Sequence, residues 1–112
     1  METPISWADF EKVEMAVGTI IAVDPFPEAR KPAYKLTLDF GPKGIKRSSA
    51  QLTKLYKPAD LLGMQVVAVI NFPPKQIATF MSECLVLGAL GKEGEVTLLQ
   101  TERKTENGSR IA

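Results

Sequence analysis

Basic side chains are concentrated in the middle of this sequence, where their types and spacing suggest binding chemistry. Residues 24–60 contain eight lysines and arginines against four acids, whereas residues 1–23 carry a net charge of −3 and residues 61–112 have a net charge of zero. On a chain whose total charge is only +1, this distribution indicates a basic face that attracts an acidic or polyanionic partner. The alternative is that these are solvated residues at strand edges, where lysines discourage aggregation.

Side chains that could perform catalysis are scarce. The sequence has no histidine and a single cysteine, Cys84, so the commonest general base and most ligands of zinc and haem are missing. The acids are scattered singly, as Asp24, Asp39 and Asp60 are, without an obvious pair. We therefore expect no catalytic residues, no metal site and no cofactor. Cys84 lies in an apolar run and is expected to be a small buried hydrophobic residue.

The overall composition indicates one ordinary globular domain. A length of 112 residues, with 45% hydrophobic and 24% charged side chains, predicts a single domain over residues 1–112. No apolar run is long enough to span a membrane. Residues 1–10 lack the basic and apolar regions of a signal peptide. We therefore expect a cytoplasmic protein without membrane insertion.

The pattern of apolar residues predicts mainly β-structure. Ser6, followed by Trp7, Phe10 and Val13, indicates a short N-terminal helix, which must dock on another surface because it is too short to be stable alone. Gly18 is expected to mark a bulge or a sharp bend in the first strand. Alternating or β-branched runs predict strands, and one stretch has the composition of a helix: strands at 15–23, 34–40, 45–50, 64–71, 82–89 and 96–100, and a helix at 51–62.

The order of these elements predicts the fold. Three strands, one helix and two more strands are the arrangement of the OB-fold, a five-stranded Greek-key barrel with a helix between strands three and four. We therefore predict an all-β chain with short helices, in which this barrel follows a short N-terminal helix and precedes an extra C-terminal strand. Barrels of this kind bind oligonucleotides or oligosaccharides across one face and its flanking loops.

Two segments then resemble a known family. Residues 51–63, Gln-Leu-Thr-Lys-Leu-Tyr-Lys-Pro-Ala-Asp-Leu-Leu-Gly, resemble the tyrosine–proline–leucine–glycine helix of tRNA-binding domains of the methionyl-tRNA synthetase type. Residues 71–75, Asn-Phe-Pro-Pro-Lys, resemble the asparagine–proline–basic loop of that family, and Ser82 falls where its loop-closing serine falls. The resemblance runs from Asp9 to about Leu99, so we expect the module alone, with no synthetase attached.

Within that family, four strings in order are similar to the CsaA group of bacterial export chaperones. They are residues 27–36 (Pro-Glu-Ala-Arg-Lys-Pro-Ala-Tyr-Lys-Leu), 48–51 (Ser-Ser-Ala-Gln), 71–74 (Asn-Phe-Pro-Pro), and 82–83 (Ser-Glu) with 85–88 (Leu-Val-Leu-Gly). This resemblance implies a homodimer formed through the terminal segments, residues 1–14 and 96–112. It also implies binding to unfolded precursor proteins and to the translocase motor SecA, and it leaves room for some retained binding of tRNA.

The loop of residues 72–81 departs from the pattern of the tRNA-binding relatives. Where they carry lysine and arginine, this chain has Pro73, Gln76, Ala78 and Thr79, and only Lys75 keeps a charge. Because phosphate contacts dominate nucleic-acid affinity, we expect weak binding of tRNA. The loop is instead apolar, which suits an unfolded segment or a signal sequence. The alternative is that its large apolar residues close the end of the barrel: Phe72, Ile77 and Phe80.

These observations lead to a candidate site and two candidate functions. The aromatic residues divide into Tyr56, expected in the core, Trp7 and Phe10, expected at a dimer interface, and Tyr34, a candidate ligand contact. We predict a non-catalytic, CsaA-like chaperone that binds unfolded precursor proteins for export; the alternative is a dimeric tRNA-binding cofactor. The predicted ligand-binding residues are Arg30, Lys31, Tyr34, Lys35, Lys46, Arg47, Asn71, Phe72, Pro74, Lys75, Phe80, Met81, Ser82 and Glu83.

Overall fold

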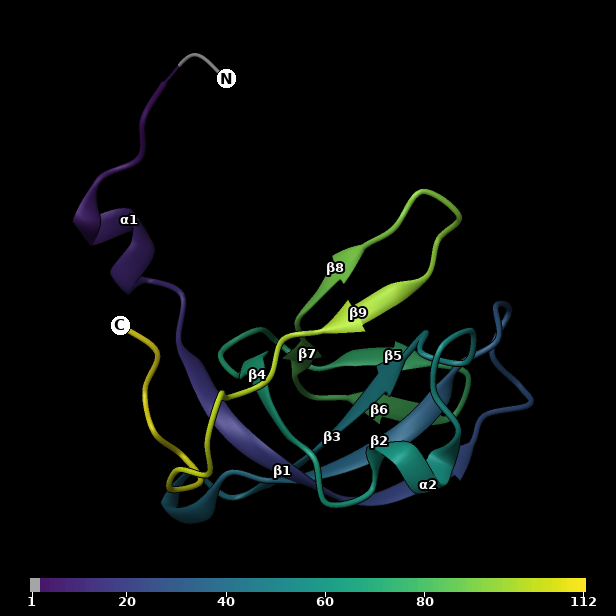
Figure 1. Cartoon of the computed structure of the whole chain (residues 1–112). Helices are drawn as coiled ribbons and strands as arrows, with labels where there is room; N and C mark the ends of the chain where they lie inside the picture. The colour runs from purple at the N-terminus through teal and green to yellow at the C-terminus, as the bar shows by residue number, and fades with distance from the viewer. Residues whose placement is uncertain (1–2) are drawn as a thin grey trace.

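Five antiparallel strands form a nearly closed barrel (Figure 1). The structure is a computed structural model that describes residues 3–112. Met1 and Glu2, the start of the segment predicted to dimerise, lie outside the described residues. The strand order in the sheet is β3-β2-β1-β4-β7. The bounds are β1 (Met15–Pro25), β2 (Tyr34–Asp39), β3 (Ile45–Ala50), β4 (Gln65–Val69) and β7 (Leu85–Val86). The predicted five-stranded barrel, with a helix between its third and fourth strands, is confirmed.

The remaining elements are short and lie outside the five-stranded sheet. Two hairpins extend the chain on either side of β7, and one 3₁₀ turn separates β2 from β3 (Figure 1). Their bounds are α1 (Trp7–Glu11), η1 (Gly41–Lys43), α2 (Pro58–Leu61), β5 (Lys75–Ile77), β6 (Phe80–Ser82), β8 (Gly88–Leu90) and β9 (Val96–Leu98). Within the described residues no helix is long and apolar enough to cross a membrane.

Two sequence-based boundaries were wrong. The helix expected over 51–62 is confined to Pro58–Leu61, because the residue before a proline is driven to extended backbone and Lys57 has φ −92° and ψ 158°. The strand expected over 82–89 is divided among β6, β7 and β8. The connection that we expected to be a loop, residues 72–81, contains the hairpin β5–β6, which turns through Ala78 and Thr79.

The barrel core is built from the inward-facing residues of the strands. Leu36, Leu38 and Phe40 recur at every second position and are fully buried, as the alternation along β2 predicts. Leu61, from α2, closes one end of the barrel and is also fully buried. The buried members of this core are Ala16, Ile20, Leu36, Leu38, Phe40, Leu52, Leu61, Val66, Ala68, Cys84 and Leu98.

The two terminal segments lie beside each other near the start of β1 (Figure 1). The C-terminal segment covers part of that strand, since Val17 N–H donates to the Ser109 carbonyl and Ile111 N–H donates to the Met15 carbonyl. Helix α1 precedes β1 and contributes no buried residue. The extra C-terminal strand is β9. The chain beyond β9 returns to the barrel and bonds to β1.

Gly18 does not form the bulge that the sequence suggested. The irregularity in β1 lies between Ile20 and Ala22, where the register with β2 shifts. Gly18 is instead required by packing, since a Cβ at this position would lie 2.6 Å from Cε1 of Phe40. The ring of Phe40 is fully buried and has little room to move.

We therefore expect Gly18→Ala to lower the free energy of unfolding by about 1–3 kcal/mol, the usual cost of overpacking a core. Urea titration followed by circular dichroism measures this loss. Phe40→Leu removes the ring that meets the new methyl group. Adding Gly18→Ala to a Phe40→Leu variant should therefore lower the free energy of unfolding by less than Gly18→Ala lowers it in the original protein. A loss below about 0.5 kcal/mol for Gly18→Ala, within the range of a neutral surface change, would contradict the close approach.

Candidate ligand-binding face

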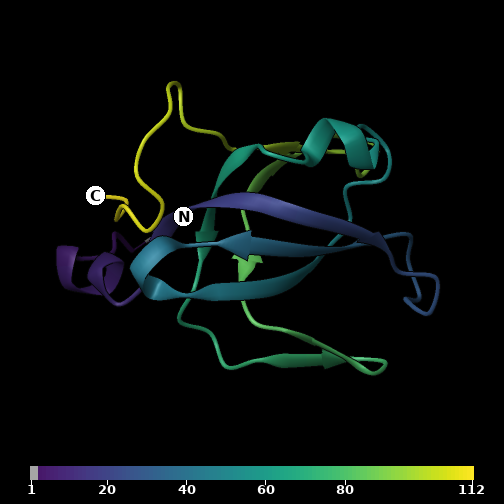
Figure 2. The ribbon, with the colours of Figure 1, turned by 90° about the horizontal axis from the view of Figure 1, so that it is seen from below.

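Outward-facing side chains of β2 and β3 form the floor of the candidate site. Because side chains alternate along a strand, Lys35 lies on the opposite side of β2 from buried Leu36, and Arg47 lies opposite buried Ser48 on β3. Hairpin β5–β6 and loop 26–33, which joins β1 to β2, reach the same end of the barrel (Figure 1, Figure 2). We call the surface made by Lys35, Arg47, hairpin β5–β6 and loop 26–33 the ligand face.

A small apolar cluster joins the hairpin to the loop. Phe26, Ala33 and Phe80 are 4%, 7% and 4% exposed and pack together, separately from the barrel core. Two cations lie over the rings: Lys35 Nζ is 4.9 Å from the centroid of Phe26, and Arg47 Cζ is 4.6 Å from that of Phe80. Such contacts contribute about 0.5–2 kcal/mol each. The floor of the ligand face therefore combines positive charge with aromatic rings.

Three hollows border the ligand face. One of about 360 Å³ lies between Lys35, Arg47 and the tip of the hairpin, and one of about 660 Å³ lies between loop 26–33 and β5. The third, of about 300 Å³, lies at the base of the hairpin beside β7. The hollows bring together ten of the residues that the sequence suggested: Arg30, Lys31, Lys35, Arg47, Phe72, Lys75, Phe80, Met81, Ser82 and Glu83. Pro74 is exposed between them.

The apolar residues of the hairpin segment, by which we mean residues 72–82 with hairpin β5–β6 and the residues leading into it, differ in how far they are exposed. Phe72 and Met81 are 54% and 45% exposed, so both offer apolar surface to a ligand. Phe80 is buried against Phe26 in the small apolar cluster, so it neither offers surface to a ligand nor joins the barrel core, whose end the packing alternative expected it to close. Ile77 is half-buried against the same cluster. An apolar surface of two exposed side chains remains beside the cations.

Three residues of the predicted set lie away from the ligand face. Tyr34 shares the inward side of β2, packs on the barrel core, and its hydroxyl donates to the Tyr56 carbonyl at 2.8 Å. Lys46 pairs with buried Leu38 and so shares the inward side of β3. The third, Asn71, lies at the start of β1. Strand alternation would have placed Tyr34 correctly from the sequence, because it shares the side of Leu36 and Leu38. It would have misplaced Lys46, because Ile45, the large apolar residue of β3, faces outward.

Asn71 connects the end of β4 to the segment that leads from α1 into β1. Its side-chain amide donates to the Lys12 carbonyl at 2.7 Å, and its side-chain oxygen accepts from Glu14 N–H at 2.9 Å. Both side-chain groups of this asparagine are therefore engaged by the backbone. Its position gives it a role in orienting α1, at the opposite end of β1 from loop 26–33.

Ser82 and Glu83 help to close the barrel against β3. Glu83 N–H donates to the Arg47 carbonyl at 2.7 Å, and the Glu83 carboxylate accepts from Arg47 N–H at 2.9 Å. Ser82 Oγ accepts from Ser49 N–H at 3.2 Å. We call residues 82–84, together with their partners on β3, the closure segment. Side-chain acceptors here replace part of the backbone ladder that a regular strand pair would supply.

Two buried residues complete the closure segment. Ser48 Oγ donates to the Cys84 carbonyl at 2.8 Å, which satisfies a polar group that is 1% exposed. Cys84 is buried, as predicted. Burial raises the pKa of its thiol from 9.0 to about 11, so the group stays protonated and unreactive at neutral pH.

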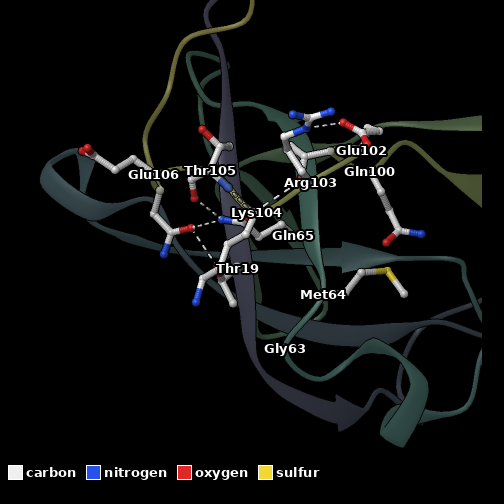
Figure 3. Close-up of a pocket in the computed structure, with 12 residues that line it drawn as sticks. Thr19, Gly63, Met64, Gln65, Gln100, Glu102, Arg103, Lys104, Thr105 and Glu106 are labelled. Carbon is white, nitrogen blue, oxygen red and sulfur yellow. Dashed lines mark hydrogen bonds and ion pairs between the residues drawn. The ribbon is translucent and has the colours of Figure 1, made fainter.

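A larger hollow, of about 960 Å³, lies under the C-terminal loop of residues 100–107 (Figure 3). Gln65 holds this loop, since its side-chain amide donates to the Thr105 carbonyl at 2.7 Å and its oxygen accepts from Thr105 N–H at 3.0 Å. Asn107 accepts from Gln65 and from Thr19. The polar groups are thus engaged with one another, which indicates an anchor for the loop and not a ligand site. Among the described residues no cluster of acids and cysteine could hold a metal ion.

Comparison with known proteins finds two groups of relatives: structures of chaperones named CsaA, and methionine–tRNA ligases. Residues 15–110 match the family model described as "Putative tRNA binding domain". The crystal structure of chaperone CsaA from Bacillus anthracis str. Ames is 47% identical, with a TM-score of 0.93 over 98% of this chain and 100% of that one. The CsaA chaperone protein from Picrophilus torridus is 50% identical, with a TM-score of 0.91 over 97% of this chain and 100% of that one.

Synthetases are also similar, over a small part of their length. The methionine–tRNA ligase of Thermococcus kodakarensis is 35% identical over 108 residues, which are 96% of this chain and 14% of the ligase. That of Methanocaldococcus jannaschii is 32% identical over 90% of this chain and 15% of the ligase. This chain therefore spans only about one seventh of the length of these curated relatives.

We expect the carboxylate of Glu83 to stabilise the barrel through its bond to Arg47 N–H. Glu83→Ala removes the acceptor and should lower the free energy of unfolding by about 1 kcal/mol, the net value of a typical hydrogen bond. Glu83→Gln keeps an oxygen acceptor and should lose much less. Denaturant titration of both variants measures the difference, and equal losses would show that the bond to Arg47 is not what stabilises the closure segment.

Proposed function

The chain belongs to the tRNA-binding domain family that its residues 15–110 match, and from that premise we propose that it is a non-catalytic, CsaA-like chaperone that binds unfolded precursor proteins for export. The support is the 47–50% identity to two structures named as CsaA chaperones, each of which it covers completely. On this proposal the protein acts in the cytoplasm and hands precursor proteins to the translocase motor SecA.

One observation carries the proposal: exposed apolar side chains lie beside cations on the ligand face. Phe72 and Met81 are about half exposed, and both border hollows that Lys75, or Lys35 and Arg47, also line. An unfolded precursor presents apolar side chains and charged groups along one extended segment. A surface with both features can bind such a segment without reading its sequence.

The magnitudes favour burial of apolar side chains over charge. Burying one large apolar side chain contributes about 1.5–3 kcal/mol, whereas an exposed ion pair contributes about 0–1 kcal/mol. Two or three buried side chains, less the cost of ordering the client, give an affinity near or weaker than about micromolar. Binding of that strength allows the client to be released to a translocase.

A second candidate function, binding of tRNA, is favoured by the cations of the ligand face. Arg30, Lys31 and Lys75 line one hollow, and Lys35 and Arg47 line the next. Such a row can contact phosphates, but few contacts give an affinity that falls steeply with salt. We therefore propose that any binding of tRNA is modest and depends on low ionic strength.

We also propose that the protein is a homodimer formed through its terminal segments. Trp7 is 82% exposed and Ile5 is 70% exposed, and α1 buries none of its residues on its own barrel. An apolar helix face of this kind is normally covered, and a second copy supplies a self-complementary surface. Phe10, which is half-buried, would complete the interface.

We expect Phe72→Ser combined with Met81→Ser to abolish the suppression of aggregation of an unfolded client protein. The double change removes both exposed apolar side chains of the hairpin segment while leaving buried Phe80 in place. Light scattering of a chemically unfolded client diluted into buffer measures the activity. The matched control is Leu62→Ser, which removes an apolar side chain that is 57% exposed at the end of α2.

The control variant should suppress aggregation as well as the original protein does. If Lys75→Ala abolishes the activity while the double serine variant keeps it, binding is electrostatic and the apolar surface has no part in it.

We expect Trp7→Ala to shift the protein from dimer to monomer. Aromatic residues supply much of the energy of an interface, and losing one at its centre costs about 2 kcal/mol or more, equivalent to at least about a 30-fold weaker association. Sedimentation velocity over a micromolar concentration series measures this change. A monomer for the unaltered protein, or an unchanged dimer for Trp7→Ala, would exclude an interface centred on α1.

A further inference from the structure

Hairpin β5–β6 and loop 26–33 are far apart in the sequence but contact each other through a pair of phenylalanines. The ring centroids of Phe26 and Phe80 are 5.4 Å apart, with the ring planes tilted by 58°. Such an offset, tilted arrangement is the favourable geometry for two aromatic rings. The pair is the centre of an apolar cluster that is distinct from the barrel core and that contains Ala33, with Ala29 and Ile77 at its edge.

Besides this pair, the hairpin is held where β6 lies against β3, and its own strands add little stability. Its strands are three residues each, and an isolated hairpin is at best marginally stable in water. Ala78 in its turn has a φ of 54°, which is unfavourable for a residue with a Cβ. The base of the hairpin is held by Ser82 at the closure segment, whereas its tip has Phe80 and Ile77 against the loop.

The same ring pair also supports the two cations of the floor. Lys35 Nζ lies 4.9 Å from the centroid of Phe26 and 5.7 Å from that of Phe80, so it sits close to both rings. Arg47 lies over Phe80. Loss of Phe26 would therefore separate the hairpin from the loop and remove one of the two rings beside Lys35.

We propose that Phe26 is a positioning residue of the ligand face: its contact with Phe80 joins loop 26–33 and hairpin β5–β6 into one preformed unit to which a ligand binds. This inference rests on the proposed function for the identity of the ligand. Phe26 is 4% exposed, so it acts through Phe80 and the cations and not by touching the ligand. A preformed surface binds more tightly because it loses less conformational entropy when the ligand binds.

The test compares Phe26→Ala with Val66→Ala, which removes apolar contacts from the barrel core at a residue that is fully buried. Two quantities are measured at a temperature at which circular dichroism shows both variants to be folded. The first is hydrogen exchange of the amides of residues 76–81 in the ligand-free protein. The second is the dissociation constant for a permanently unfolded, carboxymethylated polypeptide.

We expect Phe26→Ala to speed exchange in residues 76–81 and to weaken binding of the polypeptide by about tenfold, the effect of losing one good aromatic contact. Exchange in β1 and β2 should stay unchanged. Val66→Ala should lower the overall stability while leaving the dissociation constant within about twofold. Phe26→Leu, which keeps apolar contact with Phe80, should restore most of the binding.

Two results would overturn the proposal: unchanged exchange in residues 76–81, or faster exchange with an unchanged dissociation constant. Equal weakening by Val66→Ala would also overturn it, because the effect would then follow general stability. If the unaltered protein does not bind the polypeptide, the proposed function fails. The exchange comparison still decides whether Phe26 joins the two segments.

Discussion

The closure of the barrel between β3 and residues 82–84 is the constraint on which the rest of the structure depends. The two edges of the sheet meet there through a backbone bond from Glu83 and through side-chain acceptors of Ser82 and Glu83. An open sheet would expose the inward faces of β2 and β3, which carry fully buried Leu36 and Ser48. Closure also anchors the base of hairpin β5–β6, because that hairpin ends at Ser82. Both the burial of the barrel core and the position of the hairpin on the ligand face therefore depend on this closure.

The chain forms two separate apolar clusters, one inside the barrel and one outside it. The barrel core, around Phe40, stabilises the fold. The outer cluster, around Phe26 and Phe80, holds a hairpin and a loop over the floor and carries two cations on its rings. Exposed Met81 lies beside Phe80 in one hollow, and exposed Phe72 lines another hollow at the base of the hairpin. On the proposed function, the exposed apolar side chains beside the cations bind an extended, unfolded polypeptide, whereas phosphate contacts would dominate the affinity for a nucleic acid.

The sequence predicted the parts of this fold that follow from local patterns. Alternation in residues 34–40 located β2, the strand expected at 45–50 is β3, and Ser6 correctly indicated the start of α1, where its side chain accepts from Asp9 N–H. Contacts between distant residues could not be predicted in this way. Burial of Phe80 depends on Phe26, 54 positions earlier, although an aromatic residue between Pro25 and Pro27 was a usable signal. No local sequence pattern indicates that Gln65 bonds to the C-terminal loop, because its partner Thr105 lies 40 positions later.

The central claim, that the ligand face binds unfolded polypeptide mainly by burying apolar side chains, is tested most directly by a paired titration. Fluorescent tRNA and a permanently unfolded polypeptide are each titrated with the protein at about 50 mM and about 200 mM salt, the range over which phosphate contacts weaken steeply. The account predicts binding of the polypeptide with micromolar or weaker affinity that changes by less than about threefold, and binding of tRNA that weakens by at least about tenfold. Tight binding of tRNA at the higher salt, with none of the polypeptide, would contradict it.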